Sequence, residues 1–432
     1  MKAAIWLLTL FGVAVALSIG ADHPGGLVSV FISGYRVDFS INFAVLILVA
    51  SFLVVYLATR AVSSLYALPQ IAKRWRLQQR ERSMHESLLN ALEQLMTGRF
   101  LRSLRSAALT IDSANTLEQL TSESVSAPKY LNQLKALAHL IGAESAHALR
   151  DIATRETHLQ AILKETSEDS EAAYETKAAS LLSAARWSLA EADPVGALAW
   201  LRELKSGVSR RTLTLRLKLK ADRLAKHHLA ALETARLLNK HGAFSENAAQ
   251  GLLRSLCTSS LNDCYDQHQL QQTWRLLDSH ERSIPDVAIH ASERMLSLSG
   301  SSQTALTWLT PIWNVMITRP SALSDSEQVR LIQTLASHLK VIGNDKHWLT
   351  VVDQARSMNP RSALLQYLSA MACMYNGLWG KAQQLMLEAA QQLNHSGLQK
   401  AAWLTLAELA VQRGQEAEAV VYWKKIALSE SY

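Results

Sequence analysis

The chain has 432 residues, 49% of them hydrophobic, which is enough apolar material for two or three domains. Only 8 prolines and 17 glycines are present, so the composition favours helix almost throughout and argues against a sheet-based fold. The net charge of +7 is concentrated in residues 60–105 and 209–228, which argues against a generally nucleic-acid-binding surface.

Two uncharged apolar stretches, residues 3–21 and 39–59, lie near the start of the chain. A helix of roughly 20 apolar residues crosses a membrane, so both are predicted to be transmembrane helices. A cleavable signal peptide is the alternative for the first stretch, because Lys2 precedes it and small residues end it. Arg36 is the one basic residue between the stretches, whereas many follow the second, which predicts that both termini face the cytoplasm.

The loop between the two predicted spans carries an alternating pattern around Ser33-Gly34. Its apolar positions are Val28, Val30, Ile32, Tyr35, Val37 and Phe39. Alternation with a period of two on both sides of a glycine predicts a small β-hairpin.

A basic segment follows the second predicted span. Pro69 is expected to interrupt the chain, and IAKRWRLQQRER is expected to resume as a helix. Lys73, Arg74 and Arg76 are predicted to bind the anionic membrane surface, at about 1 kcal/mol each. A specific lipid or protein contact is the alternative. The predicted domains are a membrane anchor (1–60), this segment with a first helical hairpin (61–130) and a helical superhelix (131–432).

From about residue 85 the sequence predicts helix–turn–helix units. A small residue lies near each turn, an alanine follows about five positions later, and bulky apolar residues occur four and seven positions after it. The matching sets are Ala197, Leu201 and Leu204; Ala231, Ala235 and Leu238; Ala305, Leu309 and Ile312; Ala382, Met386 and Ala389; and Ala419, Trp423 and Ile426. A period of about 34 residues is typical of tetratricopeptide repeats, which predicts an all-α solenoid after the two spans.

Two stretches of this array need separate interpretation. Residues 213–221 alternate like a strand, but Leu213, Leu217, Ala221 and Leu224 keep helical spacing, so a helix with these residues as its apolar face is predicted. In NGLWGKA, the glycines Gly377 and Gly380 predict a tight turn, with Trp379 and Ala382 beginning the next helix. Trp379 is expected to wedge between hairpins, and ligand stacking is the alternative.

Residues that carry chemistry are sparse. GxGxxG, GxxxxGK[ST], HExxH and GxSxG motifs are absent, so an enzyme is not expected and no cofactor or metal is evident. Cys257, Cys264 and Cys373 form no CxxC pair, which favours reduced thiols. His139 and His147 lie two helical turns apart, too far to share an ion without a third ligand.

Arg216, Lys220 and Arg223 fall on one face of the predicted helix. A solvated face is the simplest interpretation of this spacing. An acidic partner protein, or a small molecule with carboxylates, would also need clustered cations.

The segments GYRVDFSIN, LPQIAKRWR and NALEQLMTGRF resemble the N-terminal region of the HemY family, and LLQYLSAMACMYNGLWGKAQQLMLEAA is similar to its most characteristic repeat. The resemblance implies a bacterial inner-membrane protein with cytoplasmic tetratricopeptide repeats, acting at a late step of protohaem IX synthesis. It implies a scaffold for haem-pathway enzymes, with no agreed catalytic residues to carry over. The unrelated flavin-dependent protoporphyrinogen oxidase of the same name is not resembled, because its dinucleotide fingerprint is missing.

Three functions remain open at this point. The first is the membrane-anchored scaffold, with late haem-pathway enzymes and the anionic membrane surface as partners and no nucleic acid. The second is a tetrapyrrole carrier or regulator, which would bind haem or protoporphyrin. The third is an envelope-assembly adaptor, which is disfavoured by the two predicted spans and the missing CxxC pairs.

Overall fold

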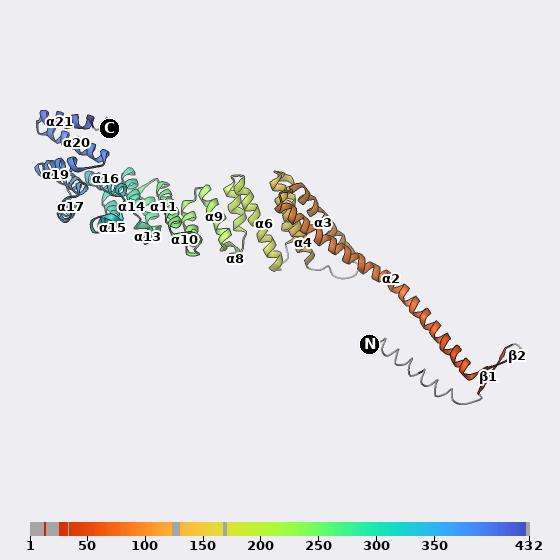
Figure 1. Cartoon of the computed structure of the whole chain (residues 1–432). Coiled ribbons are helices and arrows are strands. Elements are labelled where there is room, and N and C mark those ends of the chain that lie inside the picture. The colour runs from red at the N-terminus through yellow and green to blue at the C-terminus, as the bar shows by residue number, and fades with distance from the viewer. Residues whose placement is uncertain (1–12, 14–25, 33, 123–129, 167–170, 429–432) are drawn as a thin grey trace. The chain divides into compact units, whose positions relative to one another are not determined.

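The computed structural model describes residue 13 and residues 26–32, 34–122, 130–166 and 171–428. Within these residues the chain is helical apart from one β-hairpin, as the sequence predicts (Figure 1). It divides into two compact units, one ending at Thr176 and one starting at Lys177. The predicted domain bounds at residues 60 and 130 stay predictions.

The first unit contains two strands and the first four described helices: β1 (Leu27–Ile32), β2 (Tyr35–Ser40), α2 (Ile41–Met96), α3 (Phe100–Ser122), α4 (Tyr130–Ala148) and α5 (Ile152–Glu165). Helix α6 (Glu171–Ala190) includes the residues at which the units are divided. The second unit continues with α7 (Pro194–Arg202), α8 (Ser206–Ser209), α9 (Thr212–Leu224), α10 (His228–Lys240), α11 (Glu246–Asn262), α12 (Gln267–Leu276), α13 (Ser279–Arg282), α14 (Pro285–Ser297), α15 (Ser302–Thr318), the 3-10 helix η1 (Pro320–Ala322), α16 (Asp325–Ile342), α17 (Lys346–Met358), α18 (Ala363–Tyr375), α19 (Trp379–Gln392), α20 (Ser396–Gln412) and α21 (Glu416–Leu428).

The β-hairpin forms as predicted. β1 and β2 pair antiparallel, with Ile32 opposite Tyr35 and Leu27 opposite Ser40. Gly34 in the turn has φ +93°, a left-handed conformation that glycine adopts without strain. The register therefore places the predicted alternating residues opposite one another on one face of the ribbon.

Helix α2 begins directly after the hairpin, where the Ser40 hydroxyl accepts a hydrogen bond from the Phe43 N–H at 3.3 Å. It then runs for 56 residues without a break (Figure 1). The predicted interruption at Pro69 is therefore wrong. Proline removes one backbone donor, and the flanking Leu, Ala, Gln and Arg residues favour helix strongly enough to continue through it.

The two predicted spans stay predictions. Residues 3–21 lie outside the described part of the chain except for Val13, and residues 39–59 fall in the end of β2 and in α2. Among the described residues, no helix is identified as long and apolar enough to cross a membrane.

The core of the first unit is built from small residues. Ala91 of α2 and Ala107 of α3 are fully buried, so these two helices approach closely. The Ser103 hydroxyl donates to the Ala91 carbonyl at 2.7 Å, and the Ser145 hydroxyl of α4 donates to Ser103 at 3.0 Å. Buried hydroxyls thus find partners where the helices meet, and α2, α3 and α4 form one packed group.

One type of turn closes many of the helices in both units. A residue with positive φ follows the helix, and the next N–H bonds to the carbonyl five residues earlier, as from Leu378 to Cys373 at 2.9 Å. This Schellman geometry satisfies the last carbonyls of a helix and lets the next helix start at once. It occurs at Gly98, Arg150, Ala192, Lys226, Gly242, Ser299, Gly377 and Gly414. The repeated helix–turn–helix unit therefore has one recurring stop signal.

The core of the second unit runs continuously from α9 to α20, and α21 packs against it. The predicted alanine positions are buried: Ala197, Ala231, Ala235, Ala305, Ala382 and Ala419 are each exposed by 1% or less. The helix pairs α9–α10, α14–α15, α18–α19 and α20–α21 pack against each other as hairpins. This is the α-solenoid arrangement that the repeat pattern predicts.

Two predicted packing residues are not buried. Trp423 is 50% exposed on α21, where its neighbour Tyr422 stacks on Trp403 instead, with ring centroids 5.8 Å apart. Trp379 is 45% exposed at the start of α19, so the expected wedge between hairpins is wrong. Helical spacing predicted that Trp379 and Trp423 lie on an apolar helix face. It did not predict which residues of that face a neighbouring helix covers.

Candidate functional site

Helix α9 carries the basic residues singled out from the sequence. Its buried side consists of Leu215, Leu219 and Ala221, which lie in the core against neighbouring helices. The predicted helix is confirmed, and Ala221 of the predicted apolar face is buried, but Leu213 is 57% exposed and Leu224 is 51% exposed, so that part of the predicted face is wrong. Thr214 and Asp222 are buried beside these three residues, so the buried face of α9 is rotated away from Leu213 and Leu224.

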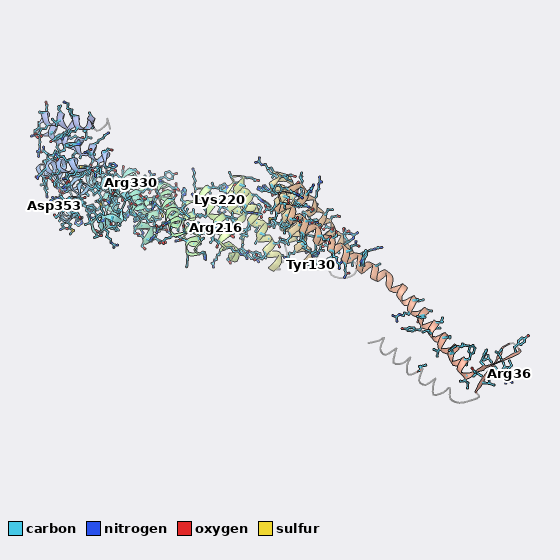
Figure 2. The ribbon with its side chains drawn as sticks, in the orientation of Figure 1. Arg36, Tyr130, Arg216, Lys220, Arg330 and Asp353 are labelled. Carbon is cyan, nitrogen blue, oxygen red and sulfur yellow. The ribbon has the colours of Figure 1, made fainter. Side chains whose placement is uncertain are left out.

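Arg216, Lys220 and Arg223 all lie on the exposed side of α9; Figure 2 labels the first two. The Arg216 guanidinium donates to the Ala243 carbonyl at 3.1 Å, which fixes its position. In the described part of the chain, none of the three forms an ion pair with a carboxylate. Three neighbouring cations on one helix repel one another by a few tenths of a kcal/mol per pair. A bound anion would relieve that repulsion.

These cations border a hollow of about 430 Å³. It is lined by Arg216, Lys220 and Arg223 together with Leu219, Leu224 and Phe244. Cations around an apolar floor suit a partner that offers carboxylates beside an apolar side chain. We name this surface, made of these six residues, the α9 face.

Sequence patterns identified the cations of the α9 face but not its apolar floor. Leu224 was assigned to the core, and Phe244 follows the turn at Gly242 outside any helix. One sequence feature could have indicated the apolar floor. The helix carries Leu213 and Leu224 on one side and Leu215 and Leu219 on another, and both sides cannot be buried.

A buried carboxylate lies on the other side of α9. Asp222 is 2% exposed, and one of its oxygens has no hydrogen-bond partner. Burial raises the pKa of Asp222, while the positive charges of Lys218, His227 and Arg202 act against that rise. His227 lies 3.9 Å away, within reach of an ionic contact when it is protonated.

The other predicted positions lie as follows. The side chain of Arg76 is exposed on α2, and those of Lys73 and Arg74 lie outside the described part of the chain. Gly377 is in the turn before α19, with φ +77°. Gly380 is inside the first turn of α19 rather than in the turn itself, and Ala382 is 1% exposed.

Two histidines meet in the first unit, and no sequence pattern predicts their contact. Nδ1 of His139 on α4 lies 2.8 Å from Nδ1 of His158 on α5, so one ring donates its proton to the other. A Cβ at Gly142 would lie 2.9 Å from the His158 ring, so glycine makes this approach possible. Burial, followed by the charges of His158 and Lys135, lowers the pKa of His139 to about 4.

These partly buried histidines form a neutral hydrogen-bonded pair at neutral pH. Within the described residues, no group of three or more His, Cys, Asp or Glu side chains is placed to hold a metal ion. The three cysteines are buried thiols, and burial raises the pKa of Cys257 to about 12. A thiol with that pKa stays protonated at neutral pH and is a poor nucleophile.

The helical hairpins and their repeated turns define a helical-repeat protein. Residues 26–122 match the family model described as HemY protein N-terminus, which confirms the resemblance to the HemY family. No curated protein matches the chain.

Several solved structures are similar to the chain at low identity. They include the Naa15/Naa10 complex bound to HypK (13% identity, TM-score 0.24, covering 81% of this chain and 64% of that one). The P58(IPK) TPR domain has 16% identity and a TM-score of 0.20, covering 79% of this chain and 98% of that one. The APC/C hetero-tetramer Cut9-Hcn1 has 13% identity and a TM-score of 0.21, covering 78% of this chain and 65% of that one. The chain thus spans about two thirds of the length of the first and third.

Proposed function

We propose that this protein is a HemY-type repeat scaffold that is anchored in the bacterial inner membrane and organises enzymes of a late step in protohaem IX synthesis. The family match supports the assignment to this pathway. The observation that carries the scaffold role is the α9 face, where three cations that have no carboxylate partner among the described residues surround an apolar hollow. The proposal is that the array offers this surface to a partner protein.

The anchor is proposed to include the first part of α2. Residues 41–59 carry no charged side chain. Their apolar side chains are widely exposed in the isolated chain, with Leu46 at 62% and Val54 at 64%. A helix with exposed leucines and valines around it is stable in hydrocarbon rather than in water. The basic residues that follow, including Arg76, would then lie at the cytoplasmic surface.

The proposed recognition is electrostatic at the rim and apolar at the centre. The cations of the α9 face would pair with acidic residues of the partner, and Phe244 and Leu224 would be covered by an apolar side chain. Rim charges mainly raise the association rate and lose strength as salt rises. The apolar contact would supply the part of the affinity that salt does not remove.

A charge-reversal experiment tests this function. The variant Arg216→Glu, Lys220→Glu and Arg223→Glu and the wild type are each purified by affinity from native membranes, and the co-purified proteins are identified by mass spectrometry. The matched control reverses three exposed lysines elsewhere, Lys240, Lys340 and Lys346, which changes the net charge equally.

The proposal expects haem-pathway enzymes with the wild type and the control, and at least about a tenfold loss with the α9 variant, equivalent to about 1.4 kcal/mol. Equal recovery from all three proteins would show that the α9 face is only solvated. Recovery of no haem-pathway enzyme from the wild type would refute the scaffold function itself.

A further inference from the structure

A second hollow lies in the same unit, away from the α9 face. It has a volume of about 650 Å³ and lies between α12, α13 and α15. Sites for small molecules usually have volumes of about 300–1,000 Å³. The size of the hollow therefore suits a small molecule.

Two tryptophans form one wall of this hollow. The rings of Trp274 and Trp308 are stacked, with centroids 4.7 Å apart and an angle of 22° between their planes. Trp274 is 6% exposed and fixed in the core, whereas Trp308 is only partly buried. The buried ring thus supports the outer one, which is held as a rigid aromatic surface toward the hollow.

Two arginines, Arg275 of α12 and Arg282 of α13, also line the hollow. Arg282 Nε donates to the Leu277 carbonyl at 3.0 Å, which orients the side chain while its other guanidinium nitrogens remain available. Within the described residues neither arginine forms an ion pair, and no Asp or Glu lines the hollow.

A nearby arginine, unlike these two, has a carboxylate partner. Arg236 lies against Glu281, one residue before Arg282, and holds it through two hydrogen bonds of 2.6 and 2.9 Å. Glu281 is therefore already paired outside the hollow, and no carboxylate among the described residues neutralises Arg275 or Arg282. Uncompensated cations beside an aromatic surface are a favourable setting for an anion.

Hydroxyl groups complete the lining. Ser279, Ser283, Thr304 and Thr307 all border the hollow. Ser283 and Thr307 donate their protons to backbone carbonyls, at 2.6 Å each, so their oxygens remain as acceptors. A ligand with ring or amino N–H groups could bond to these oxygens while its acidic group faces the arginines.

We propose that this hollow binds a small planar aromatic anion, whose ring stacks on Trp308 and whose carboxylate is held by Arg275 and Arg282. The inference does not rest on the scaffold function, because it uses none of the residues of the α9 face. It extends that function by giving the array a small-molecule site of its own. The charge requirement follows from the arginines, and the planarity requirement follows from the tryptophan pair.

Naphthoate and naphthamide are suitable probes, since they share a planar ring and differ in the charge of one group. Binding to the full-length protein in detergent is followed by tryptophan fluorescence and calorimetry. The proposal expects saturable naphthoate binding with a Kd below about 1 mM and binding of naphthamide that is weaker by about tenfold or more. Equal affinity for the two probes, or no saturation by naphthoate, would overturn it.

Variants locate the site. Arg275→Gln with Arg282→Gln should remove the preference for naphthoate, and Trp308→Leu should weaken both probes. Arg319→Gln, which changes an exposed arginine at the end of α15 outside the hollow, is the matched control and should bind as the wild type does. The arginine variants keep the tryptophan pair, so they remain informative if Trp308→Leu proves unstable.

A peptide ligand is the competing outcome. If an acidic tryptophan-containing peptide binds in the hollow while naphthoate does not, the site recognises a protein segment and the small-molecule proposal is wrong. Naphthoate binding that is unaffected by all three substitutions would place the probe elsewhere and would also overturn the assignment. Neither result would affect the scaffold proposal, whose test depends on the α9 face.

Discussion

Replacing Arg236 by methionine should loosen the middle of the second unit. Arg236 of α10 holds Glu281 of α13 at 2.6 and 2.9 Å and donates to the Leu276 carbonyl at 3.0 Å. Glu281 is 2% exposed, whereas the Arg236 side chain is 26% exposed. Removing one partner of a buried pair costs about 3–5 kcal/mol. Because Arg236 is partly solvated, we expect a loss of about 2–4 kcal/mol.

Amide hydrogen exchange measures this loss where it occurs, which suits a repeat array whose hairpins open separately. Peptides from α10 and from the α12–α13 segment should lose protection by about 30-fold to 700-fold, since 1.4 kcal/mol corresponds to a factor of ten. Arg254→Met is the control. Arg254 is 50% exposed, and its partner Asp286 keeps Arg330 at 3.2 Å, so an effect of at most about 1 kcal/mol is expected.

The stability that the Arg236–Glu281 pair contributes should depend on pH. Burial raises the pKa of Glu281, but the hydrogen bond from Arg236 and the Asp278 N–H outweigh it, so the pKa lies below its ordinary value of 4.5. Such a carboxylate contributes stability above the unfolded pKa, and that contribution is lost as pH falls through the folded pKa. The difference between wild type and Arg236→Met should therefore be large at pH 7 and shrink below about pH 4.5. A change in protection below twofold at pH 7, or one independent of pH, would refute the reasoning.

The remaining predictions concern packing, turns and topology. Ala382→Trp should lower stability by about 1–3 kcal/mol, because a fully buried alanine leaves no room for a ring; an unchanged melting temperature would place it outside the helix contact. Gly377→Val should destabilise by about 1–2 kcal/mol, since its φ is +77°, and denaturant titration measures this. Ser299→Gly should instead stabilise by up to about 1 kcal/mol, because a left-handed residue (φ +53°) then loses its Cβ strain; a lower midpoint would contradict it. A reporter active only in the periplasm, fused after Tyr432, should stay silent, and activity would reverse the proposed topology.

Local patterns predicted much of this fold. The alternation around Gly34 gave the hairpin with its register, because one period and one turn residue determine both. The recurring alanines predicted the buried contacts, since close helix approach requires a small side chain at that position. The glycines at the turns were visible as well. The non-glycine turn residues, such as Lys226, were not, because positive φ is unusual for them and leaves no compositional trace.

The errors have physical causes beyond a local pattern. Pro69 does not end α2, because a long helix tolerates the loss of one backbone donor. Leu213 and Leu224 are exposed because neighbouring helices, not periodicity, choose which side of an amphipathic helix is covered. The Trp274–Trp308 pair and the arginines beside it join residues from three helices, and no spacing in one segment encodes such a meeting.

The central claim is that this array recruits haem-pathway enzymes through the α9 face. Photo-crosslinking in living cells tests it most directly, with a photoreactive amino acid at Lys220 in the α9 face and, as the matched control, at the exposed Lys340 of α16. The account predicts that a late haem-pathway enzyme is captured from position 220 and not from position 340. Capture of no haem-pathway enzyme from position 220, or equal capture from both positions, would contradict it.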